Sequence, residues 1–203
     1  FYMASKNLVF LSFDFKFIRT FFQESSTVFI SNFFSSMYSI SNNVLLGIFA
    51  TNTIVGIYSS FEKIITALKS LYMPLYQALF PFVSRKENKK EIIKKLILPI
   101  ALSGLAMMLI FYNFSEFFIY IVYSNEELLQ NISYFEYMTV IPLIACVNML
   151  FNFLYLNSMK MYKERMYTMI TAGIVNFVIA ITLLNLNFEI LSVVISYIIT
   201  EIV

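Results

Sequence analysis

The stretch from Ser59 to Gln77 carries ionisable and polar side chains inside an apolar part of the chain. Its members Ser59, Glu62, Thr66, Lys69, Met73 and Gln77 follow one another at steps of three or four residues. In a helix this spacing places them on one face, here called the polar stripe, and Lys63 lies about 100° to the side of Glu62. A charge near the centre of a bilayer costs about 2.5 to 3.5 kcal/mol on insertion scales, so such residues usually face a cavity or a bundle interior.

The chemistry that such a cavity favours is recognition of an anionic headgroup with many hydroxyls. Glu62, Lys63 and Lys69 together carry a net charge of +1, and Lys binds phosphate as a point charge. We expect Lys63 and Lys69 to attract a phosphate-bearing substrate and Glu62 to tune them. Coupling of transport to protons or sodium ions at Glu62 is an alternative role, since intramembrane carboxylates often serve it.

Two other segments carry milder polar patterns. The first holds Ser31, Ser35, Tyr38 and Asn42, and the second holds Asn148, Asn152 and Tyr155, again at steps of three or four residues. Hydrogen bonds between packed helices, worth about 0.6 kcal/mol each, are an alternative explanation of both sets. The complete set of candidate substrate-binding or cavity residues is Glu62, Lys63, Thr66, Lys69, Gln77, Ser31, Ser35, Tyr38, Asn42, Asn148 and Asn152.

Enzymatic and metal chemistry are not expected. The chain has no His and one Cys, Cys146, which excludes a Cys/His metal site and an internal disulfide. We predict no catalytic residue, no metal ligand and no cofactor.

Most basic residues lie in three clusters separated by long stretches with almost no charge. The clusters are Lys6, Lys16 and Arg19; Arg85, Lys86, Lys89, Lys90, Lys94 and Lys95; and Lys160, Lys163 and Arg165. The turns expected between them, near residues 51–53, 124–131 and 185–189, carry no basic residue. Because cytoplasmic loops of membrane proteins are enriched in Lys and Arg, this alternation predicts a multi-pass protein whose basic loops and both ends are cytoplasmic.

The predicted fold class is all-α, a polytopic transmembrane helical bundle. The chain has 60% hydrophobic and 13% charged residues, whereas soluble domains average roughly 25% charged residues. A span needs about 20 apolar residues, and Pro142 is expected to kink the fourth span. The six predicted spans lie at about 26–49, 56–80, 96–116, 137–158, 167–186 and 190–203, the last of them cut short.

Residues 1–24 differ from the six spans. Their aromatic residues Phe10, Phe13, Phe17 and Phe21 recur every three or four positions, with Asp14, Lys16, Arg19 and Gln23 among them. This pattern predicts an amphipathic helix in the cytoplasmic headgroup layer; a loop whose aromatic rings pack on neighbouring helices is the alternative. Because the chain begins with Phe and its last residues are apolar, we expect it to be an internal piece of a longer protein.

Residues at three places in the chain resemble those of one transporter family. They are Phe29-Ile30-Ser31 through Tyr38, Asn42 and Leu46-Gly47; Val55-Gly56-Ile57-Tyr58-Ser59 with Glu62-Lys63; and Gln77-Ala78-Leu79-Phe80-Pro81 with Ser84-Arg85. In these segments the chain resembles the O-antigen and capsule repeat-unit flippases (Wzx-type). Those proteins form the polysaccharide-transporter branch of the multidrug/oligosaccharidyl-lipid/polysaccharide exporter superfamily. The resemblance covers nearly the whole chain, with the six spans similar to helices seven to twelve.

The resemblance implies two six-helix lobes around a central cavity, with residues 25–203 as the second lobe and residues 1–24 joining the two. It implies a flippase of the bacterial inner membrane that works by alternating access. The substrate would be an undecaprenyl-diphosphate-linked oligosaccharide, moved from the inner to the outer leaflet for surface polysaccharide synthesis. The implied partners are this lipid-linked oligosaccharide, membrane lipids and an N-terminal lobe of the same protein, with no nucleic acid.

Other functions leave parts of the sequence unexplained. A multidrug or cation antiporter of the same superfamily would favour an acidic cavity, and the net positive charge of Glu62, Lys63 and Lys69 argues mildly against it. A lipid II flippase of peptidoglycan synthesis is close in substrate and stays open. A membrane polysaccharide polymerase or ligase usually needs a large outer loop with Arg or His, which the predicted outer turns lack. A purely structural membrane subunit does not account for Glu62 and Lys69.

Overall fold

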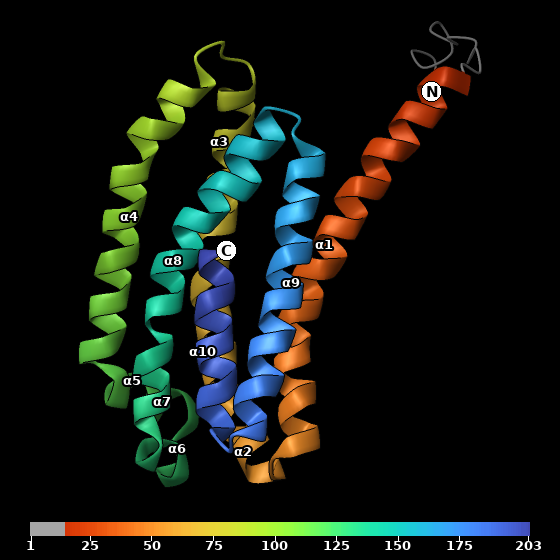
Figure 1. Cartoon of the computed structure of the whole chain (residues 1–203). Coiled ribbons are helices and arrows are strands. Elements are labelled where there is room, and N and C mark those ends of the chain that lie inside the picture. The colour runs from red at the N-terminus through yellow and green to blue at the C-terminus, as the bar shows by residue number, and fades with distance from the viewer. Residues whose placement is uncertain (1–14) are drawn as a thin grey trace, which may run out of the picture.

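The computed structural model describes residues 15–203, and every regular element in that range is helical. The elements are α1 (Phe15–Phe49), α2 (Asn52–Ser70), α3 (Tyr72–Ser84), α4 (Lys89–Asn113), α5 (Ser115–Tyr123), α6 (Glu126–Gln130), α7 (Ile132–Met138), α8 (Val140–Met149), η2 (Leu150–Leu156), α9 (Tyr162–Asn185) and α10 (Glu189–Ile202). The long helices run along one common direction as a bundle (Figure 1). The predicted all-α class is therefore confirmed for the described residues.

Three helical stretches are long and apolar enough to cross a membrane by length and composition. Within the described part of the chain they are Lys89–Asn113, Ile132–Leu156 and Tyr162–Asn185, at the positions of the third, fourth and fifth predicted spans. The other predicted spans are shorter or more polar: α10 has 14 residues, and α2 carries three charged residues. The total of six spans stays a prediction.

Helix α1 is continuous over 35 residues, whereas the sequence predicted a boundary at residues 24 and 25. The hydroxyls of Ser26 and Thr27 donate to the backbone oxygen of Gln23 at 3.0 and 2.8 Å. Such bonds back to the preceding turn let Ser and Thr stay within a helix instead of ending it. The first part of the predicted amphipathic segment, with Phe10 and Phe13, lies outside the described residues.

Two of the predicted spans are interrupted three residues before a proline. The second span divides into α2 and α3 at Leu71, because Pro74 has no N–H to donate to the carbonyl of Ser70. The fourth divides at Thr139, next to the kink predicted at Pro142. After α8 the chain continues as the π-helix η2, and π-turns inside helices occur frequently at functional sites.

The basic loops gather at one end of the bundle. The α3–α4 and η2–α9 connections, with Arg85, Lys86 and Lys160, lie at the top of Figure 1, and the α1–α2 and α9–α10 connections lie at the bottom. Helix α6, which carries Glu126 and Glu127, lies at the bottom as well. This separation of charge accords with the predicted loop orientation, which itself stays a prediction.

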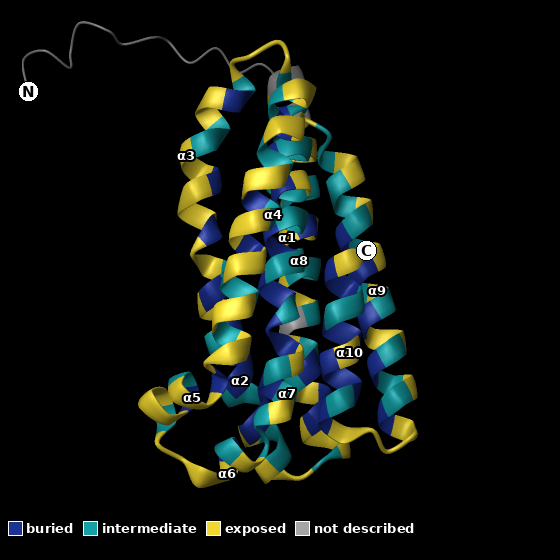
Figure 2. Ribbon diagram, turned by 90° about the vertical axis from the view of Figure 1, so that its left-hand side faces the viewer, coloured by how far each residue is buried: buried dark blue, intermediate teal, exposed yellow. Residues whose placement is uncertain are grey.

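Two apolar clusters pack the bundle and leave a junction between them. The first includes Phe61 of α2 and Phe135 of α7, whose ring centroids are 5.6 Å apart; the second joins α3, α4, α8 and η2 around Tyr76. Figure 2 shows buried residues where α2, α7 and α10 meet and exposed residues along α3 and α4. Leu68 belongs to the first cluster and Tyr72 to the second, so Lys69 lies at the junction.

Candidate functional site

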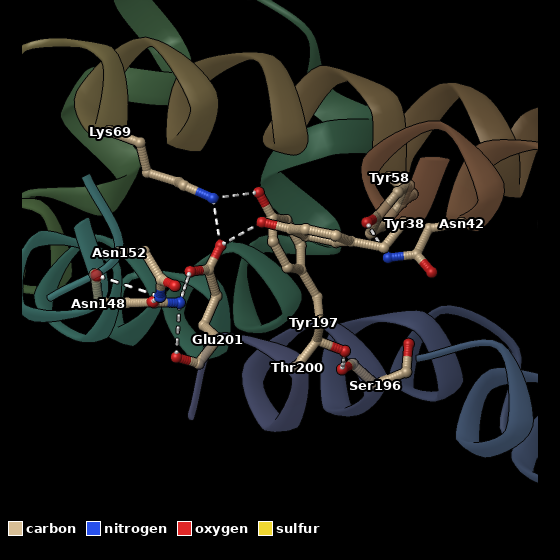
Figure 3. Close-up of polar contacts among 10 residues, drawn as sticks. All are labelled: Tyr38, Asn42, Tyr58, Lys69, Asn148, Asn152, Ser196, Tyr197, Thr200 and Glu201. Carbon is tan, nitrogen blue, oxygen red and sulfur yellow. Dashed lines mark hydrogen bonds and ion pairs between the residues drawn. The ribbon is translucent and has the colours of Figure 1, made fainter. Parts of the chain in front are cut away.

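An ion pair inside the bundle joins Lys69 of α2 to Glu201 of α10 (Figure 3). The side chain of Lys69 is 16% exposed and that of Glu201 is 3% exposed. The Lys69 ammonium also donates to the Tyr197 hydroxyl at 2.9 Å and lies 4.8 Å from the centre of the Tyr197 ring. Because Tyr197 and Glu201 are four residues apart on α10, one face of this helix presents both to the ammonium.

Both oxygens of the Glu201 carboxylate accept hydrogen bonds. Oε1 accepts from the Tyr38 hydroxyl at 3.2 Å as well as from Lys69, and Oε2 accepts from the Asn148 amide at 3.2 Å. Asn148 also donates to the backbone oxygen of Glu201 at 3.1 Å. A buried charge is costly unless it is paired and hydrogen-bonded, and these donors meet that requirement. We call Tyr38, Lys69, Asn148, Tyr197 and Glu201 the ion-pair network.

A cavity of about 360 Å³ lies beside the ion-pair network and is lined by side chains of α1, α2, α3, α8, η2, α9 and α10. Its polar lining consists of Ser35, Tyr38, Thr66, Lys69, Ser70, Asn148, Asn152, Arg165 and Glu201, and its apolar lining consists of Met73, Met149, Phe153 and Met169. Two cations and one carboxylate therefore line the cavity, which has a net formal charge of +1. Hydroxyl and amide groups supply both hydrogen-bond donors and acceptors.

Arg165 lies in the first turn of α9 and brings the second cation to this cavity. Its Nη2 donates to the amide oxygen of Asn32 at 2.8 Å, and its Nη1 lies 3.5 Å from the amide oxygen of Asn157. Both acceptors are neutral, and the buried Nε has no acceptor within residues 15–203. Among the described residues, no carboxylate forms an ion pair with Arg165.

Six of the sequence-predicted candidates line the cavity: Ser35, Tyr38, Thr66, Lys69, Asn148 and Asn152. Two others are buried and bonded elsewhere, since Asn42 donates to the Tyr58 hydroxyl and Glu62 accepts from Asn43. Ser31 is also buried, and its hydroxyl has no partner among the described residues.

The expected common cavity for Glu62, Lys63 and Lys69 differs from the observed arrangement. Lys63 and Gln77 are exposed and do not line the cavity. Lys63 is six residues before Lys69, a rotation that places the two side chains on different sides of α2. Gln77 follows the interruption at Leu71, and the polar stripe reaches the cavity only as far as Met73 of α3.

Four polar residues of the site are not among the candidates predicted from sequence: Ser70, Arg165, Tyr197 and Glu201. Glu201 is an ionisable residue within the sixth predicted span, the same signal that singled out Glu62, and Tyr197 lies one turn before it. Arg165 was grouped with the cytoplasmic basic cluster because α9 was expected to begin later. The helix begins at Tyr162, so Arg165 lies in its first turn and lines the cavity.

The N-terminal part of the chain is similar to a known protein family. Residues 1–87 match the family model described as "Polysaccharide biosynthesis protein". No curated protein and no solved structure matches the chain. The matched stretch includes α2 and Lys69, and together with the apolar helices it supports a membrane protein related to polysaccharide biosynthesis.

Proposed function

We propose that this protein is a membrane transporter of lipid-linked oligosaccharide. In this proposal it moves an undecaprenyl-diphosphate-linked oligosaccharide from the inner to the outer leaflet of the bacterial inner membrane, for synthesis of a surface polysaccharide such as O-antigen. The observation that carries the proposal is a cavity within an apolar helix bundle whose charged lining residues, Lys69, Arg165 and Glu201, give it a net charge of +1. Cationic side chains suit the phosphate groups, and hydroxyls and amides suit the sugars. The similarity of residues 1–87 to polysaccharide biosynthesis proteins supports the same class.

The proposed architecture follows the resemblance to the Wzx-type flippases. The described bundle is one lobe, and its cavity faces a second, N-terminal lobe of the same protein across the substrate path. Rocking of the two lobes exposes the cavity to each side of the membrane in turn. The substrate keeps all its covalent bonds during this passage, so the proposed transporter needs no catalytic residue and no cofactor.

The deciding experiment measures where the lipid-linked oligosaccharide resides in cells. Deletion of the gene is expected to leave the oligosaccharide on the cytoplasmic leaflet, inaccessible to a lectin added to spheroplasts, and to reduce surface polysaccharide. The full-length protein should restore both. An unchanged distribution between the leaflets contradicts the proposal, and restored transport of lipid II or of organic cations instead would assign the protein to another branch of the superfamily.

Two lysines of α2 provide a matched pair of variants for the same assay. Lys69→Ala is expected to abolish transport, because it removes a charge from the cavity and leaves Glu201 without its cation. Lys63→Ala removes the same charge from an exposed position of the same helix and should retain transport. Full activity of Lys69→Ala at normal protein level contradicts a role of the cavity in transport.

A further inference from the structure

We infer that Arg165 and Asn152 form the subsite for the glycosyl-phosphate part of the substrate, whereas Lys69 is reserved for Glu201. The inference rests on the proposed function and specifies which cavity residues hold which chemical group. It reverses the expectation from sequence, in which Lys63 and Lys69 attract the phosphate.

The positive charge of Lys69 already has its partners within the protein. Its ammonium is paired with Glu201, donates to Tyr197 and lies against the Tyr197 ring. A phosphate approaching this ammonium would also meet the Glu201 carboxylate, since both line the cavity. The attraction of the cation and the repulsion of the carboxylate oppose each other there, and the pair leaves little net charge for a ligand.

The positive charge of Arg165, by contrast, has no compensating carboxylate among the described residues. Its hydrogen bonds go to two neutral amide oxygens, and its Nε is left without an acceptor. A guanidinium presents five N–H donors in a planar fork that matches two oxygens of a phosphate. Arg165 is half-buried and lines the cavity, so an anionic ligand there meets a cation whose charge no carboxylate offsets.

Asn152 supplies the complementary acceptor in the same cavity. Its amide nitrogen donates to the side-chain oxygen of Asn148, while its own side-chain oxygen is buried and has no donor. A cation without a counter-charge and a side-chain amide line one cavity, and together they match a ligand that joins an anion to a hydroxyl group. The first sugar of a phosphate-linked oligosaccharide has this chemistry: the phosphate accepts from Arg165 and a sugar hydroxyl donates to Asn152.

The position of Arg165 agrees with a role early in binding. It lies near the end of the bundle where the basic loops gather, within a few residues of the exposed Lys160 and Lys163. Cationic groups at this end of the bundle raise the local concentration of an anionic ligand. A phosphate that enters from this end reaches Arg165 in the first turn of α9, ahead of the ion-pair network.

The test is binding of farnesyl diphosphate, a short isoprenyl diphosphate, to the purified full-length protein, with farnesol as the neutral probe. Arg165→Gln is expected to raise the Kd for farnesyl diphosphate about ten- to hundredfold, the usual effect of losing hydrogen bonds to a charged group. Lys163→Gln removes the same charge two residues away at an exposed position and should change this Kd less than about twofold, the level of a screened surface charge. Binding of farnesol should be equal in both variants.

A second variant separates the two halves of the subsite. Asn152→Ala is expected to weaken binding of farnesyl-diphosphate-linked N-acetylglucosamine but not of farnesyl diphosphate, because only the first probe carries a sugar hydroxyl. Thermal unfolding of each purified variant establishes that it is folded. Equal Kd values for Arg165→Gln and the unsubstituted protein overturn the inference, as does a protein that binds farnesol as tightly as farnesyl diphosphate.

These outcomes are distinguishable from failure of the proposed function. If gene deletion blocks movement of the oligosaccharide and Arg165→Gln binds farnesyl diphosphate normally, the subsite assignment falls and the transport function stands. If gene deletion leaves the distribution of the oligosaccharide between the leaflets unchanged but Arg165→Gln still weakens binding of farnesyl diphosphate, the transport proposal falls. The subsite is then assigned to a different isoprenyl phosphate.

Discussion

Lys69 and Arg165 bring two positive charges to one cavity, and their surroundings differ in every respect that matters for binding. Lys69 is paired with a buried carboxylate and touches an aromatic ring, whereas Arg165 donates to neutral amides only. The same formal charge therefore stabilises the contact of α2 with α10 in one case and remains available to a ligand in the other. The comparison shows that a cation lining a cavity is to be judged by its partners and not by its burial.

The largest predicted effect follows from removing the carboxylate of the pair. Glu201→Ala leaves the Lys69 ammonium buried without a counter-charge, and breaking such a pair costs about 3–5 kcal/mol of unfolding free energy. Denaturant titration in detergent micelles measures this loss. The control is Glu91→Ala, which breaks the exposed pair Lys95–Glu91 within one helix and should cost about 0.3–0.5 kcal/mol. Similar losses in the two variants would show that the buried pair has no special role.

Replacing both members of the pair sharpens the same comparison. Lys69→Met combined with Glu201→Leu removes both charges, and well-packed apolar replacements of buried pairs are often neutral or stabilising. We expect the unfolding free energy of the double variant to exceed that of either single variant by about 2 kcal/mol or more. A double-mutant cycle then gives the coupling energy between the two residues. Losses that simply add would contradict direct coupling of Lys69 to Glu201.

Overpacking the contact between α4 and α8 has a smaller predicted effect on stability. A Cβ at Gly104 of α4 would lie 2.5 Å from the Cys146 sulfur and 3.1 Å from the Leu143 Cα on α8. Gly104→Ala should therefore destabilise the protein by about 1–3 kcal/mol, the range for overpacked sites. At Gly47 of α1 an added Cβ meets nothing within 4 Å, so Gly47→Ala should be stabilising by about 0.5–1 kcal/mol. Thermal unfolding that ranks these two variants in the opposite order would contradict the tight α4–α8 contact.

A small effect on stability is predicted for removing the Arg165 guanidinium. Arg165→Met loses two hydrogen bonds to neutral amides but also removes a charge without a counter-charge, and the two changes offset each other to within about 1 kcal/mol. Denaturant titration should place this variant close to the unsubstituted protein even where its affinity for farnesyl diphosphate falls. A loss as large as that of Glu201→Ala would make Arg165 an architectural residue like Lys69.

Local patterns in the sequence predicted a useful part of this structure. Three- and four-residue steps placed Lys69 and Thr66 on one face of α2, and both line the cavity. The kink predicted at Pro142 lies next to the interruption at Thr139. Both features depend on residues within a few turns of one another, and that is the range over which helical periodicity and proline geometry act.

The sequence by itself determined an all-α, apolar chain with charges on the face of α2 and most other basic residues gathered in three clusters. Only the tertiary structure decided which charge meets which. Glu201 is 132 residues from Lys69, and Arg165 enters the cavity because α9 begins at Tyr162. Periodicity assigns a residue to a face of its own helix. Which other helix lies against that face depends on how the helices are oriented when their apolar side chains pack together.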